Sequence, residues 1–114
     1  MSILPRMDLP LRLLVFALLF PASLTSQAAD QATLKMGRSL FNAEASPPCA
    51  VCHSLADAGA SGAIGPDLDV LKPSPERVAT AVRGGIGVMP AFESLTEEQI
   101  SAIARYVSAV AGRR

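Results

Sequence analysis

Two thiols and an imidazole stand within five consecutive positions, Cys49-Ala50-Val51-Cys52-His53. Together these groups can hold an iron porphyrin. One helical turn places the two cysteines on nearly the same side of the backbone, so both sulfurs can reach the two vinyl groups at one edge of the macrocycle. The histidine that follows can offer a ring nitrogen to the iron. This spacing predicts one covalently attached haem c, bound through Cys49 and Cys52, with His53 as an iron ligand.

Three other kinds of site use a Cys-x-x-Cys pair. A structural zinc site needs four sulfur or nitrogen ligands, whereas Cys49, Cys52 and His53 are the only Cys and His residues in the sequence. A thioredoxin-type dithiol belongs beside a strand-helix-strand unit, which this sequence does not predict. A structural disulfide in an exported protein would close a very small loop and stabilise the chain little. The motif therefore favours haem attachment.

The second axial ligand has few candidates, because residues 29–114 contain only two methionines, Met36 and Met89. Met36 falls inside a predicted helix, where a role as core filler accounts for it. Met89 falls in a segment rich in Gly and Pro, where a thioether can be held toward a metal. We predict His53/Met89 ligation, which raises the haem potential. A five-coordinate iron, or ligation by Lys35 or Lys72, stays open.

The elements that must position these residues are helices and loops. Apolar residues at helical spacing predict a first helix over residues 31–42, which Pro47 and Pro48 end. A Ser-Pro start and a Gly-Gly stop predict a second helix over residues 74–83, and a capping box predicts a third over residues 96–111. Residues 54–73 are rich in Gly and Pro and predict a long loop. No strand is predicted anywhere.

The first 28 residues have the three-part layout of a secretory signal peptide. Two arginines precede an apolar run at residues 13–20, and the small residues Ser26 and Ala28 stand where a signal peptidase reads the chain. The apolar run is shorter than the roughly 20 residues that a membrane-spanning helix needs. We predict a cleavable signal peptide over residues 1–28, a single domain over residues 29–114, a periplasmic location and no stable membrane anchor.

The composition of the predicted domain excludes one class of partner and leaves its core small. The whole chain has ten basic and ten acidic residues, and the leader removes two basic and one acidic residue, which leaves eight against nine. This near-neutral balance gives no basic surface for nucleic acid. Only Phe41, Phe92 and Tyr106 remain as aromatic residues, few for a chain of this size. We expect the haem to fill the core.

Residues 34–112 resemble the class I cytochromes c of bacterial periplasmic type. The matching residues are Gly37 and Phe41, the motif at 49–53, Gly65-Pro66, Met89-Pro90, and Ile103 with Tyr106. The resemblance implies an all-α fold, a small cytochrome c domain of three to four helices and long loops wrapped around one haem. Two features of relatives are absent, a tryptophan near a propionate and a lysine-rich face.

The resemblance also implies roles for single residues. Gly37 would let the first and last helices cross closely. The backbone carbonyl of Pro66 would accept a hydrogen bond from Nδ1 of His53, which fixes the orientation and basicity of that ring. Arg83 would contact a haem propionate or remain a solvated surface arginine.

The implied function is that of a one-electron carrier, not an enzyme. It would pass electrons from a periplasmic dehydrogenase to an oxidase or another cytochrome, and it would need the cytochrome c maturation machinery to receive its haem. Residues 49–69, with residues 54–60 after the haem histidine, resemble small cytochromes that accept electrons from periplasmic sulfite dehydrogenases. Two alternatives are a dedicated haem subunit of a heteromeric dehydrogenase and a haem protein with an open iron site.

Overall fold

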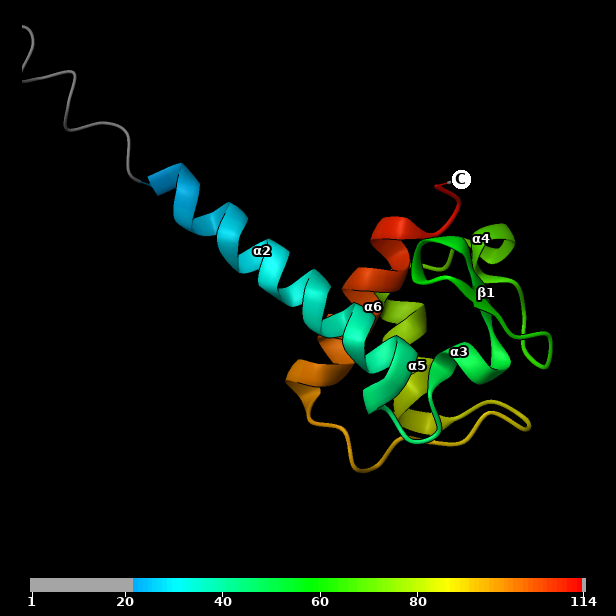
Figure 1. Ribbon diagram of the computed structural model, residues 1–114. Helices are drawn as coiled ribbons and strands as arrows, with labels where there is room; N and C mark the ends of the chain where they lie inside the picture. Colours follow the sequence, from blue (N-terminus) through cyan, green and yellow to red (C-terminus); the bar gives the residue numbers. More distant parts are fainter. Residues whose placement is uncertain (1–21, 114) are drawn as a thin grey trace, which may run out of the picture. The chain divides into compact units, whose positions relative to one another are not determined.

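A computed structural model describes residues 22–113 of the chain (Figure 1). The chain divides into two units, Met1–Asp30 and Gln31–Arg114, and the second carries every candidate ligand. Most of the predicted signal peptide, residues 1–21, lies outside the described residues. Among the helices of the described part, none is both long and apolar enough to cross a membrane.

The described chain is helical with one very short hairpin. Its elements are, in order, α2 (Ala22–Ser39), the π-helical turn η1 (Leu40–Glu44), α3 (Cys49–Cys52), β1 (Ser54–Leu55), the 3-10 turn η2 (Ala56–Ala58), β2 (Ala60–Ser61), α4 (Leu68–Leu71), α5 (Pro75–Gly84) and α6 (Glu97–Val110). The predicted all-α class is confirmed. α5 packs along α6, and α3 contacts η1.

The hairpin corrects the expectation that the chain has no strand. β1 and β2 pair antiparallel, with Leu55 opposite Ala60, and the chain reverses through Gly59 in the left-handed region at φ 66°. A glycine takes this conformation without strain. Two-residue strands are too short to show the alternation of apolar and polar residues by which a strand is recognised, so the sequence predicted only a loop here.

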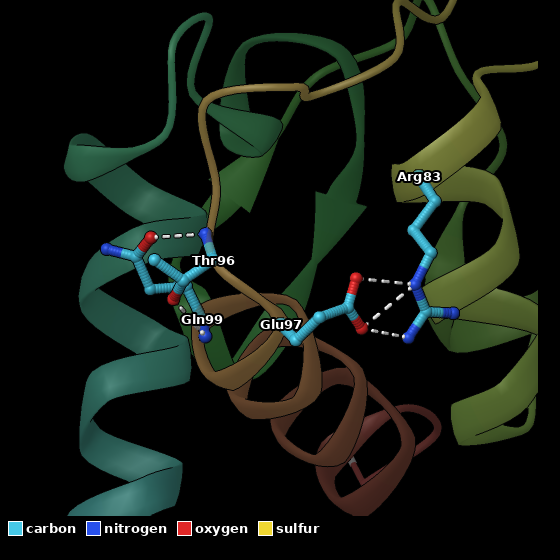
Figure 2. A network of polar contacts seen from close by, with 4 residues as sticks. All are labelled: Arg83, Thr96, Glu97 and Gln99. Carbon is cyan, nitrogen blue, oxygen red and sulfur yellow. Dashed lines mark hydrogen bonds and ion pairs between the residues drawn. The ribbon is translucent and has the colours of Figure 1, made fainter.

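The two long helices after the motif begin where their capping residues predict. The Ser74 hydroxyl accepts from the backbone N–H of Arg77 at 3.3 Å, with Pro75 in the first turn. At the start of α6, Gln99 N–H donates to the Thr96 hydroxyl at 3.2 Å and Thr96 N–H donates to the Gln99 side chain at 2.9 Å (Figure 2). Both pairs satisfy backbone donors that a helix start otherwise leaves without partners.

The main core cluster surrounds α6. Its buried side chains are Leu40, Phe41, Leu55, Leu68, Ala102, Ile103, Tyr106, Val107 and Val110. The rings of Phe41 and Tyr106 meet edge to face, with centroids 6.2 Å apart. Tyr106 also donates from its hydroxyl to Asp57 at 2.6 Å, which attaches η2 to α6. Burial, and then this carboxylate, raise the pKa of the Tyr106 hydroxyl.

The close approach expected at Gly37 is present. A Cβ on this residue would lie 2.5 Å from Cβ of Tyr106 and 2.8 Å from the carbonyl carbon of Ala102, both on α6. Met36, in contrast, is not core filler, because 37% of it is exposed. Adjacent residues of a helix point about 100° apart around its axis, so Met36, next to Gly37, lies at the edge of the face of α2 that packs on α6.

Replacement of Gly37 tests the helix crossing. We expect Gly37→Ala to destabilise the domain by about 1–3 kcal/mol, the usual cost of overpacking, because the new methyl group would meet backbone on α6. Gly84→Ala is the matched control, since a Cβ there would meet nothing within 4 Å and Ala favours a helix. Denaturant unfolding of both holoproteins measures the difference. Equal stabilities of the two variants would contradict the close crossing.

Candidate haem-binding site

The attachment motif forms a single helical turn. α3 begins after Pro48, which is extended, and ends where the backbone N–H of His53 donates to the carbonyl of Cys49 at 2.9 Å. Cys49 and Cys52 are both half-buried and are not joined by a disulfide. Within residues 22–113 no three His, Cys, Asp or Glu side chains gather as a metal site. The turn presents two thiols and an imidazole from five residues.

The ionisation of Cys49 argues against a reactive dithiol. Burial raises the pKa of this thiol to about 11, opposed by a backbone hydrogen bond and assisted by the nearby Cys52. Redox-active Cys-x-x-Cys pairs work in the opposite direction, since a lowered pKa supplies the attacking thiolate. At neutral pH, Cys49 in the folded chain stays protonated and is a weak nucleophile.

The His53 ring is held on two sides. Its Nδ1 lies 2.9 Å from the carbonyl oxygen of Pro66, the contact that the resemblance implies. With Nδ1 as the donor, the other ring nitrogen, Nε2, keeps its lone pair for a metal. A Cβ on Gly65 would lie 2.5 Å from Cε1 and 2.8 Å from Nδ1 of this ring, so the site requires glycine there.

The loop that faces the motif is itself tied to α3. Gly65 N–H donates to the carbonyl of Cys52 at 2.7 Å. A Cβ on Gly62 would lie 2.6 Å from the backbone nitrogen of His53 and 2.6 Å from the carbonyl carbon of Cys52. The close fit at Gly62 was missed from the sequence, where this residue counted only as one of several loop glycines.

Met89 occupies a tight turn built by two glycines. Met89 N–H donates to the carbonyl of Ile86 at 2.9 Å, and Ile86 N–H donates to the carbonyl of Met89 at 3.1 Å. Gly85 and Gly87 adopt φ of 69° and 56°, which side chains rarely allow. After the turn, Phe92 N–H donates to the carbonyl of Val82 at 2.9 Å and returns the loop to α5.

A second core cluster brings Met89 and the motif together. Its buried members are Ala45, Val82, Phe92 and Ile100. Cys49 and Met89 are both partly buried and both pack against it. Two segments far apart in the sequence therefore share one apolar base, with a sulfur on each.

The surroundings of these ligands fit a haem. Four large apolar side chains are exposed within three residues of a candidate haem contact: Val51, Ile64, Ile86 and Val88, with Ile64 69% and Val88 88% exposed. Three more exposed apolar side chains, Met36, Val70 and Leu71, lie farther from these residues in the sequence. A flat apolar macrocycle would cover part of this surface, and the thiols, imidazole and thioether are the donors that a covalently bound haem uses.

Arg83 lies in an ion pair. Its Nε donates to the two carboxylate oxygens of Glu97 at 3.0 and 3.1 Å, and its Nη2 donates at 2.5 Å (Figure 2). Both side chains are well exposed, so the pair contributes little stability. Of the two roles considered for Arg83, this geometry favours the surface arginine, joined here to the start of α6.

The lysines considered as iron ligands lie elsewhere. Lys72 follows α4 at φ 46°, and its aliphatic stem packs so closely on Gly112 that a Cβ there would collide with it. Gly112 follows α6, and a cation suits the carbonyl end of a helix. Lys35 is exposed on α2. Neither placement favours lysine over Met89.

Comparisons with known proteins agree with this geometry. The family model described as cytochrome C oxidase, cbb3-type, subunit III matches residues 32–107. A cytochrome c6 of Cyanidioschyzon merolae is 38% identical over 88 residues, which cover 70% of this chain and 77% of that protein. The crystal structure of the c-type cytochrome SorU from Sinorhizobium meliloti is 57% identical, with a TM-score of 0.71, over 72% of this chain and 94% of that chain.

The family match includes the motif, the Gly65-Pro66 loop, the Met89 turn and most of α6, which are the parts that build the site. Cytochromes c bind haem covalently and transfer electrons without transforming a substrate. The chain belongs to the cytochrome c family and is a small electron-transfer protein.

Proposed function

We propose that the chain is a periplasmic carrier in which Cys49 and Cys52 attach one haem and His53 and Met89 ligate its iron. The observation that carries the ligand assignment is the shared base of Cys49 and Met89 on the second core cluster. When bound, the haem supplies one-electron cycling between ferric and ferrous iron. The periplasmic location rests on the signal-peptide layout of residues 1–28.

The residues of the chain orient the ligands and exclude water. Pro66 accepts the Nδ1 hydrogen of His53, which holds the ring plane and raises the basicity of the other nitrogen. Gly85 and Gly87 allow the turn that presents Met89. If His53 and Met89 both ligate the iron, no open position would remain on it for a substrate or a gas. This arrangement favours the carrier over a haem protein with an open iron site.

The proposed electron donor is a periplasmic sulfite dehydrogenase, and the proposed acceptor is an oxidase or another cytochrome. Support for the donor comes from residues 54–60, which form β1, η2 and the start of β2 directly after His53. A donor that docks beside the attachment motif would meet this hairpin. Cytochrome c maturation machinery is the proposed partner in biosynthesis, because haem has to be attached covalently to Cys49 and Cys52.

Replacement of Met89 tests the ligand assignment. We expect Met89→Ala to keep its haem and to bind CO when reduced. Because Met ligation raises the haem potential, the variant should also lose on the order of 100 mV, where about 59 mV corresponds to a tenfold change for one electron. Met36→Ala is the matched control, a methionine exposed on α2. Redox titration and CO difference spectra give the readout. A Met89→Ala protein with the potential of the wild type would exclude Met89.

The segments around the candidate haem ligands carry few charges, which predicts a weak salt dependence of electron transfer. Residues 46–56, 59–66 and 84–92 include no Asp, Glu, Lys or Arg. We expect the electron self-exchange rate of the holoprotein, measured by NMR of mixed oxidised and reduced protein, to change less than about threefold between roughly 0.02 and 0.5 M salt. A steep dependence would mean that charged side chains govern the approach.

Direct reduction tests the donor. Catalytic amounts of a periplasmic sulfite dehydrogenase with sulfite should reduce the holoprotein at least about tenfold faster than an unrelated periplasmic dehydrogenase with its own substrate, because only the first should dock productively. Stopped-flow absorption of the haem follows the reaction. Equal rates with both dehydrogenases would argue against a dedicated donor.

A further inference from the structure

Asp69 is a buried carboxylate that joins three parts of the domain. It lies on α4 with 5% of its surface exposed. Its Oδ2 accepts from the backbone N–H of Ala56 at 2.8 Å, and its Oδ1 accepts from the backbone N–H of Gly112 at 2.8 Å. One side chain therefore links the segment after His53, α4 and the residues that follow α6.

The hydrogen bond between Ala56 and Asp69 joins the same two segments as the hydrogen bond between His53 and Pro66. His53 contacts Pro66 and Ala56 contacts Asp69, and each pair is separated by 13 residues. The same two segments, 53–56 and 66–69, are thus joined at both ends in one register. A shift of either segment along the other would break both hydrogen bonds together.

The segment between these two bonds, residues 66–69, is short and is held by further hydrogen bonds of its own. The Asp67 carboxylate accepts from the backbone N–H groups of Asp69 at 2.8 Å and Val70 at 3.3 Å, which caps α4. Proline fixes its own φ. Movement of Asp69 is therefore passed to the Pro66 carbonyl rather than absorbed between them.

Hydrogen bonds to an ionised carboxylate are about twice as strong as neutral ones, and their loss would leave two N–H groups without acceptors. We propose that Asp69 is a positioning residue for His53: its carboxylate sets the register in which Pro66 accepts from Nδ1. This inference rests on the proposed ligation of iron by His53. A looser Nδ1 hydrogen bond makes the imidazole less basic, which disfavours ferric iron.

The test compares the holoproteins of Asp69→Asn and Asp57→Asn. Both remove one negative charge, but only the first replaces one of the two acceptor oxygens of Asp69 by an NH2 donor, whereas Asp57 contacts Tyr106. At the wild-type midpoint potential, we expect Asp69→Asn to raise the ratio of reduced to oxidised protein at least threefold and Asp57→Asn to leave it within twofold. Solvent exchange of the His53 Nδ1 proton, followed by NMR, should become at least tenfold faster in Asp69→Asn and should not change in Asp57→Asn.

Asp69→Glu separates register from charge and serves if Asp69→Asn fails to fold. It keeps the charge but moves the carboxylate by one methylene, so the Nδ1 proton should still exchange faster than in wild type. Unchanged exchange in the Asp69 variants, or an equal change in Asp57→Asn, would overturn the inference. A wild-type protein without hyperfine-shifted His53 signals would instead refute the proposed ligation, and the two failures are thereby distinguished.

Discussion

The His53 ring can lie where it does because the residue that faces it has no side chain. A single methyl group at Gly65 would overlap the ring, and the neighbouring carbonyl, from Pro66, could then not reach Nδ1. Much of the surrounding structure serves this contact. Gly62 brings the loop onto α3, Gly65 returns a hydrogen bond to Cys52, and Asp67 caps the helix that follows.

The rest of the domain gives this contact a stable base. α6 supplies the largest share of the buried side chains, and Gly37 allows α2 to approach it closely. The bond from Tyr106 to Asp57 attaches the hairpin to the same helix. The Met89 turn packs on a second apolar cluster, and Cys49 packs on both clusters, so the attachment motif joins the two parts of the core.

Local chemistry explains which features could be predicted. The capping box at Thr96, the Ser-Pro start of α5 and the motif at 49–53 depend on residues close together in the sequence, and the structure contains each element where it was expected. The hairpin was missed because its strands have two residues each. The prediction that Met36 fills the core was wrong because a shift of one position along α2 moves a side chain from the buried face to its edge. The pairing of Arg83 with Glu97 depends on how two helices meet, which no local pattern records.

Asp69 illustrates a limit of a different kind. Within the run Leu68–Leu71 it looks like a surface charge among apolar residues, yet its two partners lie 13 residues before it and 43 residues after it. The separation of 43 residues between Asp69 and Gly112 affects the order in which these contacts form. Gly112 is the last of these residues to be synthesised, so the link that Asp69 makes between the segment after His53 and the segment after α6 can form only once α6 has been made. The loop around His53 therefore takes its final hydrogen-bonded form only after a segment 43 residues beyond Asp69 has joined the fold.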